Sequence, residues 1–281
     1  MLRGIKPTAV EKRLKALFYG VSGAGKTMCA LQFPAPYLID TERGCENNAY
    51  VKLLESNGGA LFQTAIFDEM IQEIKTLLTV EHPYKTLIID PLTTLYNDLL
   101  DKAALKLGTD FGKHYSEANK QMKHLLSLLV RLDMNVIITS HSKNEYGKDM
   151  IVLGQTFDCY KKLDYLFDLV IEVQKRGQSR MGVVKKSRLE SLKDGEQFEF
   201  SYKEIAKRYG SEVLEKKSES ECLTTEEQLS ELIRLIELLN IDNETITKWL
   251  TKANAASFEE MNQEHAQKCI DYLQSKIKGD K

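Results

Sequence analysis

The sequence has no long apolar segment, and this absence excludes a membrane-spanning protein. No run approaches the roughly 18 consecutive apolar residues that a membrane-spanning helix needs. Residues 1–15 are basic and have no apolar core, so we expect no signal peptide. The chain is therefore expected to work without a membrane.

Cysteine is also scarce, and the positions of the cysteines argue against a fold stabilised by disulfides or by zinc. The five cysteines are Cys29, Cys45, Cys159, Cys222 and Cys269. Their number is odd and none shows Cys-x-x-Cys spacing, so we expect neither structural disulfides nor a zinc site. A reducing compartment fits this pattern, and we expect a cytoplasmic protein.

Neither positive nor negative charge dominates the whole chain, but the charged residues are unevenly distributed along it. The net charge is −2, with 12 basic and 19 acidic residues from Asp194 onward. Residues 1–193 then carry 27 basic and 22 acidic residues, a net of +5. The near-neutral total argues against constitutive coating of nucleic acid. Two interpretations of this distribution remain open. Either the chain combines a basic catalytic part with an acidic tail that allows regulated DNA contact, or both parts simply carry ordinary solvated surfaces.

One glycine-rich stretch carries the strongest chemical signal. Residues 20–27 read Gly-Val-Ser-Gly-Ala-Gly-Lys-Thr and satisfy the P-loop pattern at every fixed position. Backbone N–H groups of such a loop cradle phosphates, Lys26 reaches the β- and γ-phosphates, and Thr27 ligates Mg²⁺. The expected nucleotide-binding residues are Gly20, Ser22, Gly23, Ala24, Gly25, Lys26, Thr27 and Met28.

Strand and helix patterns alternate on both sides of this loop. Strands are expected at residues 15–19, 37–40, 61–66, 86–90, 135–140, 166–173 and 181–185. Helices are expected at residues 26–32, 45–58 and 68–80, after Asp90 to about 107, and at 116–132, whereas 142–160 show no clear pattern. The alternation predicts an α/β fold with a mainly parallel sheet and a ligand site at the carboxyl ends of its strands.

The pattern changes near residue 216. Residues 224–228 (Thr-Thr-Glu-Glu-Gln) offer a capping box before an apolar helical stripe, and two further helical stripes follow. We expect an ATPase core at 1–215, a linker at 216–223 and a three-helix domain at 224–281.

Acidic residues at two strand ends suggest metal and water chemistry. Asp90 ends the apolar run 86–89 and fits the Walker B role of holding Mg²⁺ beside Thr27. Pro91 follows it, so the group that activates water must come from elsewhere. Glu42 is the best candidate, because its strand can lie beside the P-loop strand. Asp40 is the alternative. Glu42 could also be an acid of a solvated loop with no role in catalysis.

The order of these motifs resembles the RecA-type ATPase core. Residues 38–42 (Leu-Ile-Asp-Thr-Glu) are similar to the RecA segment whose glutamate activates water. RecA-like proteins usually end the next strand with a glutamine sensor; here it ends in Thr139-Ser140-His141, and His141 takes that place. The nearest resemblance, over about residues 12–205, is to phage RecA-like nucleotide-binding proteins, including Sak-type single-strand annealing ATPases.

This resemblance implies two further sets of residues. Lys186 and Arg188 resemble the fingers that reach the γ-phosphate on a neighbouring subunit, although a solvated basic strand end would look the same. RecA-like proteins contact DNA through loops that correspond here to about 108–115 and 143–162. The DNA-binding candidates are Lys113, Tyr115, Lys143, Lys148, Lys161 and Lys162.

Together these features predict an oligomeric, Mg²⁺-dependent ATPase that binds single-stranded DNA in phage-type recombination or annealing, in the host cytoplasm if phage-encoded. The tail is expected to meet a single-strand-binding protein or a partner recombinase. The alternative is an ATP-driven switch acting on protein. A GTPase would show Asn-Lys-x-Asp and a P-loop kinase an arginine-rich lid, and neither pattern is present.

Overall fold

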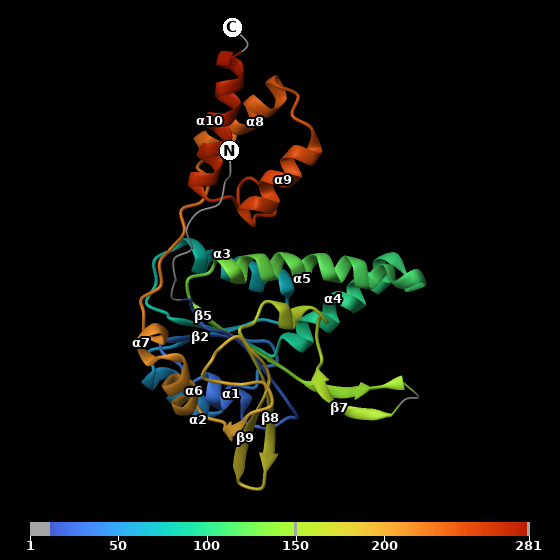
Figure 1. Ribbon diagram of the computed structural model, residues 1–281, viewed down its shortest axis with the longest axis vertical. Coiled ribbons are helices and arrows are strands. Elements are labelled where there is room, and N and C mark those ends of the chain that lie inside the picture. The colour runs from blue at the N-terminus through green and yellow to red at the C-terminus, as the bar shows by residue number, and fades with distance from the viewer. Residues whose placement is uncertain (1–11, 149–150, 280–281) are drawn as a thin grey trace. The chain divides into compact units, whose positions relative to one another are not determined.

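The computed structural model describes residues 12–148 and 151–279. These residues form two compact units (Figure 1). The first contains residues 12–65, 83–98 and 134–218, and the second contains 66–82, 99–133 and 219–279. The basic N-terminal segment expected from the sequence falls largely at residues 1–11, outside the described residues. The domain limits at 215 and 224 stay a prediction.

The first unit is built on an eight-stranded mixed sheet. Its strands are β1 (Lys15–Tyr19), β2 (Pro36–Asp40), β3 (Ala60–Gln63), β4 (Thr86–Asp90), β5 (Asn135–Ser140), β8 (Leu169–Arg176), β9 (Ser179–Ser187) and β10 (Gln197–Glu199). Their order across the sheet is β10-β9-β8-β1-β5-β4-β2-β3. The six strands from β8 to β3 in this order run parallel, whereas β9 and β10 are antiparallel to their neighbours.

The central strands follow directly from their sequence. All residues of β1, β4 and β5 are buried, as expected for parallel strands covered on both faces. The register aligns Tyr19 with Ser140 and Asp40 with Asp90. The carboxyl ends of β1, β5, β4 and β2 therefore reach the same edge of the sheet.

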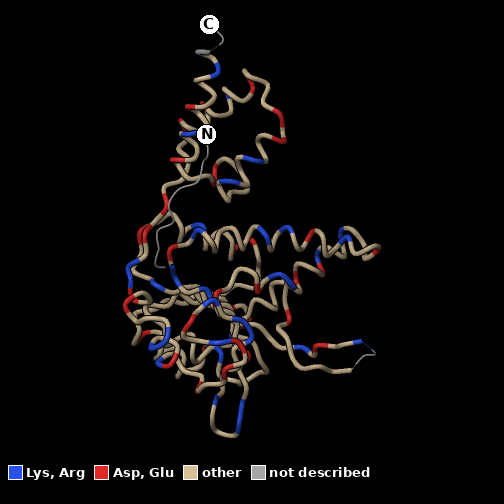
Figure 2. The backbone as a smooth tube through the Cα atoms, viewed as in Figure 1, with Lys and Arg blue, Asp and Glu red and all other residues tan. Residues whose placement is uncertain are grey.

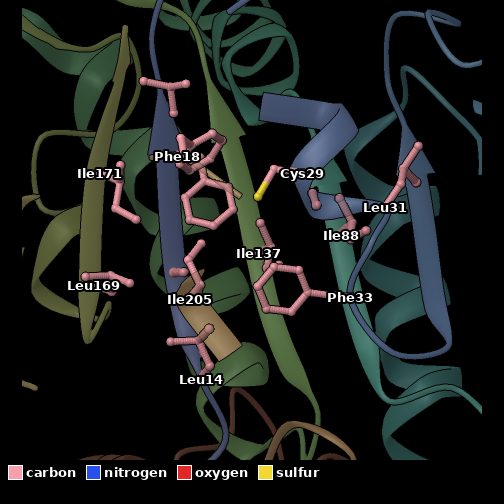
Figure 3. Packing of buried hydrophobic residues seen from close by; sticks show 14 of the residues in the cluster. Leu14, Phe18, Cys29, Leu31, Phe33, Ile88, Ile137, Leu169, Ile171 and Ile205 are labelled. Atoms are coloured by element: carbon pink, nitrogen blue, oxygen red, sulfur yellow. The ribbon is translucent and has the colours of Figure 1, made fainter. Parts of the chain in front are cut away.

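Four helices of the first unit bury one face of this sheet. They are α1 (Lys26–Ala30), α2 (Asn48–Ser56), α6 (Tyr202–Tyr209) and α7 (Ser211–Leu214). The first turns of α4 (Leu92–Leu107) also belong to this unit. Phe18 on β1 and Ile137 on β5 pack with Cys29 of α1 and Ile205 of α6 (Figure 3). Burial of these apolar side chains fixes where α1 begins, and hence where the P-loop ends.

Segments left unassigned by the sequence form an antiparallel hairpin. Strands β6 (Ser142–Tyr146) and β7 (Val152–Phe157) make a separate two-stranded sheet. Most residues of β6 are exposed, so the alternation of polar and apolar residues that marks a half-buried strand is missing. Strand β8 begins at Leu169, later than expected, because the 3₁₀ turn η3 (Leu163–Tyr165) occupies the preceding segment.

The second unit is helical. It contains α3 (Phe67–Thr79), the rest of α4, the 3₁₀ turn η1 (Asp110–Gly112) and α5 (Lys113–Arg131). It also contains α8 (Glu226–Leu238), α9 (Asn243–Ala253) and α10 (Gln263–Gly279), which are the three helices expected in the tail. The predicted capping box is present, since the Thr225 hydroxyl accepts from Gln228 N and the Gln228 side chain accepts from Thr225 N.

Within this unit, one carboxylate joins the tail to the two long helices. Glu260 lies 2.5 Å from the Lys75 ammonium on α3 and 3.1 Å from His124 Nε2 on α5. The hydrogen bond to His124, aided by Lys75, lowers the pKa of Glu260 to about 2. The carboxylate is therefore held in its charged form at neutral pH.

Candidate functional site

The P-loop connects β1 to α1 through glycines that no other residue could replace without strain. Gly20 passes so close to β8 that a Cβ there would lie 2.4 Å from the carbonyl oxygen of Val173. Gly23 and Gly25 have φ of 71° and 96°, in the left-handed region that L side chains rarely adopt. The turn can therefore fold tightly enough for its N–H groups to surround a phosphate.

Lys26 is held inside the same turn. Its ammonium donates to the carbonyl oxygens of Gly20, at 2.9 Å, and Val21, at 3.1 Å. Burial lowers the pKa of Lys26, while the carboxylates of Asp90 and Glu42 act in the opposite direction. A buried ammonium group forms stronger hydrogen bonds with a charged phosphate than with neutral carbonyl groups, so we expect Lys26 to bind a phosphate of the nucleotide.

Thr27 and Asp90 form a pair of oxygen donors suited to Mg²⁺. The Thr27 hydroxyl donates to Asp90 Oδ2 at 2.6 Å, and Thr139 on β5 donates to Asp90 Oδ1. Burial raises the pKa of Asp90, although these two hydroxyls oppose the shift. Hard oxygen ligands of this kind are those Mg²⁺ prefers, usually with waters and substrate phosphates completing the shell.

Glu42 lies at the same edge, one strand beyond Asp90. Its Oε1 accepts a 2.5 Å hydrogen bond from Thr94 Oγ1 and lies 3.5 Å from His141 Nε2. The reason given from the sequence for choosing it was wrong, because β2 pairs with β4 and β3 rather than with the P-loop strand. The carboxylate reaches the pocket because the carboxyl ends of β2 and β4 are aligned.

Asp40, the alternative to Glu42, accepts hydrogen bonds from the backbone of the turn that follows it. Its two oxygens accept from the backbone N–H groups of Glu42 and Gly44, both at 3.2 Å, and of Cys45, at 3.0 Å. Only 1% of the residue is exposed. These contacts shape the turn that carries Glu42 and occupy the lone pairs that a water-activating base would need.

The end of β5 is fixed through α4. Thr93 Oγ1 lies 3.0 Å from Ser140 Oγ and accepts from His141 N at 3.0 Å. His141 is half-exposed and directed at Glu42. The sequence identified His141, but the supporting hydroxyls of Thr93, Thr94 and Thr139 carry no pattern that would single them out.

These side chains surround a pocket of about 180 Å³. Its lining consists of Ser22, Gly23, Lys26, Thr27, Asp40, Glu42, Gly44, Cys45, Tyr50, Asp90, Pro91 and His141. The P-loop residues, both strand-end acids and His141 were expected from the sequence. Gly44, Cys45 and Tyr50 were not, because their approach depends on the turn after β2.

Comparison with known families agrees with this geometry. A family model described as an AAA domain matches residues 12–208. The chain belongs to this family. Its AAA domain is a P-loop α/β core with a mainly parallel sheet, and the C-terminal helices α8–α10 follow it, so the α/β fold class expected from the sequence is confirmed.

Two solved structures resemble the AAA domain at low identity. The crystal structure of the RadB recombinase matches 67% of this chain and 86% of its own, with 20% identity and a TM-score of 0.49. A DnaB-like replicative helicase, in a structure that also describes its interactions with primase, matches 67% and 56% of the two chains, with 12% identity and a TM-score of 0.43. No curated protein matches the chain.

Lys186 and Arg188 of the AAA domain do not line the pocket of their own chain. Lys186 donates to the carbonyl oxygen of Asp164 and lies 5.9 Å from the Tyr165 ring centre. Arg188 lies 3.3 Å from the Asp168 carboxylate and donates to the Tyr165 carbonyl at 2.8 Å. Both cations lie at the far end of β9, and their proposed role requires a neighbouring subunit.

Arg180 is a basic residue beside the P-loop that the sequence did not single out. A Cβ on Gly25 would lie 3.5 Å from the Cγ, Cδ and Nε atoms of Arg180. The guanidinium donates weakly, at 3.2 to 3.5 Å, to three carbonyl groups of the β8–β9 turn. Basic residues mark both strands of this hairpin (Figure 2).

The DNA-binding candidates lie in both units. In the second, Lys113 and Tyr115 lie on the first turn of α5 rather than on a loop, beside a fully exposed Phe111 that the sequence analysis left out. In the first, Lys143 is paired with Asp158 at 2.9 Å. The exposed lysines there are Lys148, Lys161 and Lys162. Tyr160, an aromatic residue within the 143–162 segment, is buried against Tyr96 and so is not exposed for base stacking.

None of the described helices combines the length and apolar character needed to cross a membrane.

Proposed function

We propose that this AAA domain is a Mg²⁺-dependent ATPase in which Glu42 activates the attacking water. The observation that carries the proposal is the shared pocket of Lys26, Thr27, Asp90 and Glu42. A P-loop lysine and a Walker B acid bind nucleotide, but hydrolysis also needs a group that positions water. Glu42 supplies a half-exposed carboxylate for that purpose, whereas Asp40 is engaged by three backbone N–H groups.

The residues of the pocket divide the work of hydrolysis. P-loop N–H groups and Lys26 bind the phosphates, and Thr27 and Asp90 hold Mg²⁺. When bound, Mg²⁺ offsets the negative charge of the phosphates. Glu42 orients a water for in-line attack and takes its proton, and Thr94 and His141 hold the carboxylate in place. Lys186 and Arg188 stabilise the developing charge from a neighbouring subunit in a homo-oligomer.

We further propose that the substrate partner is single-stranded DNA, in phage-type recombination or strand annealing. Support comes from exposed Lys148, Lys161 and Lys162 and from the exposed rings of Phe111 and Tyr115. Cations that track a backbone and rings that stack on bases are what single strands require. The RadB recombinase and the DnaB-like replicative helicase are similar proteins whose names agree with such a role.

A second candidate function is an ATP-driven switch that acts on a protein. It is favoured by the net charge of −7 from Asp194 onward, which repels a phosphate backbone. The two candidates differ in whether hydrolysis responds to DNA.

The test is the ATP hydrolysis rate with and without an unstructured single-stranded oligonucleotide at low salt. We expect stimulation in the wild type and its loss in the double variant Lys148→Glu, Lys161→Glu. Lys203→Glu, an exposed lysine on α6, is the matched control and should respond normally. A hydrolysis rate that does not change with DNA in the wild type or in any variant would favour the switch that acts on a protein.

A further inference from the structure

A small apolar pocket lies in the tail, between α9 and α10. It has a volume of about 160 Å³ and is lined by Trp249, Lys252, Met261, His265, Lys268, Cys269 and Tyr272. The Trp249 and Tyr272 rings meet edge to face with centres 6.1 Å apart, and Met261, which has no exposed surface, also lines the pocket. The nucleotide chemistry of the first unit uses none of these residues.

The size of this pocket limits what it can hold. Ligand and cofactor sites usually measure about 300–1,000 Å³. A cavity of about 150 Å³ lined by apolar side chains accommodates a benzene ring. The pocket therefore fits one bulky aromatic or aliphatic side chain rather than a cofactor.

The rim of the pocket is basic, although the tail as a whole is acidic. Residues 224–281 contain 7 basic and 11 acidic residues, a net charge of −4. Lys252 and Lys268 nevertheless line the pocket, and Lys276 lies 5.0 Å from the Tyr272 ring centre. Within the part of the chain that the structure describes, Glu264 pairs with one of these lysines, at 3.7 Å from Lys268, in an exposed pair that water screens strongly. The rim therefore attracts a small group of negative charges.

We propose that this pocket is a docking site for a short acidic segment of a partner protein, with one bulky apolar side chain inserted between α9 and α10. The apolar side chain fills the space beside Trp249 and Tyr272, and the segment's carboxylates pair with Lys252 and Lys268. A nucleic-acid strand fits less well, because its extended phosphate backbone would run onto the acidic surface of the rest of the tail.

Trp249 gives the experiment its signal, since it is the only tryptophan of the chain. The full-length protein is titrated with a synthetic peptide of three acidic residues followed by phenylalanine and leucine, and the tryptophan emission is followed. We expect a saturable change that weakens with salt and needs at least about tenfold more peptide in the double variant Lys252→Glu, Lys268→Glu. Lys248→Glu, on α9 but outside the pocket lining, is the matched control and should bind normally.

Two further probes decide between occupants. A peptide with lysines in place of the acids, or with alanine in place of phenylalanine and leucine, should leave the emission unchanged. Equal binding of either one, no response to the acidic peptide, or a stronger response to a single-stranded oligonucleotide would overturn the proposal. None of these results depends on ATP hydrolysis, so the docking site and the proposed ATPase can fail separately.

Discussion

Asp40 and Glu42 lie two positions apart in the chain, yet their different surroundings give them different roles at the residue scale. Asp40 accepts three backbone N–H groups and is almost fully buried, whereas Glu42 is half-exposed and faces the pocket. A carboxylate whose lone pairs are occupied by the backbone stabilises a turn, and one that remains accessible can act on water. The sequence, which left both open as the base, could not separate them because their bonding depends on the path of residues 41–45.

This difference predicts unequal effects of two conservative substitutions on the free energy of unfolding. Asp40→Asn places an NH₂ group against a backbone N–H, and we expect it to lower the free energy of unfolding by about 1–3 kcal/mol. Glu42→Gln changes a half-exposed side chain, and its unfolding free energy should stay within about 0.5 kcal/mol of the wild type. Urea unfolding measures both, and an equal loss in the two variants would contradict the division of roles.

Arg180 leads to a second prediction at this scale. Its side chain lies against Gly25 of the P-loop, within reach of a bound nucleotide. Arg180→Ala should weaken ADP and ATP binding alike by about tenfold, because a charge-assisted contact is lost in the ground state as well.

The control for this prediction is on the same hairpin. Arg176 donates instead to Gln174 and Gln197, at 3.2 and 3.1 Å. Arg176→Ala should bind nucleotide normally in a fluorescent-nucleotide titration. Similar losses in both variants would indicate a general charge effect rather than a contact at the P-loop.

At the scale of elements, the strands that the sequence predicts best are those buried on both faces. Residues 15–19, 86–90 and 135–140 match the observed strands residue for residue, because a continuous apolar run is the signature of a covered parallel strand. The β6–β7 hairpin was not predicted, since the exposed strand β6 lacks any apolar pattern. Which strands are neighbours is a long-range property, and the placement of β2 beside β4 could not be inferred from local sequence.

The contact of Glu260 with α3 and α5 makes the second unit sensitive to acid. Because the folded-state pKa of Glu260 is lowered to about 2 from an ordinary value of 4.5, its stabilising effect is complete above pH 4.5 and is lost as the pH falls toward 2. Glu260→Gln should cost on the order of 1–2 kcal/mol at pH 7, after allowance for solvent screening. The difference from the wild type should shrink steadily between pH 4.5 and 2.

Trp249 emission during urea unfolding measures this effect in the tail. The exposed Glu264, also on the tail, provides the control Glu264→Gln, which should match the wild type at every pH. A Glu260→Gln penalty that is constant with pH would show that packing rather than charge holds this contact.

At the scale of the whole molecule, the proposed finger role of Lys186 and Arg188 requires a second subunit. Lys186 and Arg188 are outside the pocket of their own chain, so a pocket completed by a neighbour is the only arrangement in which they touch phosphate. Lys26→Ala and Arg188→Ala should each lose hydrolysis by at least about a hundredfold.

Mixing these two inactive proteins should restore part of the wild-type rate. An intact pocket of one protein then meets an intact finger of the other in a mixed oligomer. No recovery at any mixing ratio, in proteins that form oligomers with ATP, would rule out a finger acting between subunits.

We propose that ATP is hydrolysed in the pocket at the carboxyl ends of β1, β2, β4 and β5, with Glu42 as the base. Single-turnover hydrolysis, with nucleotide affinity measured in parallel, tests this role in wild type, Glu42→Gln and Lys26→Ala. We expect Glu42→Gln to bind ATP normally but to hydrolyse it at least about a hundredfold more slowly, while Lys26→Ala loses binding as well. Near-normal hydrolysis by Glu42→Gln would show that Glu42 is not the base.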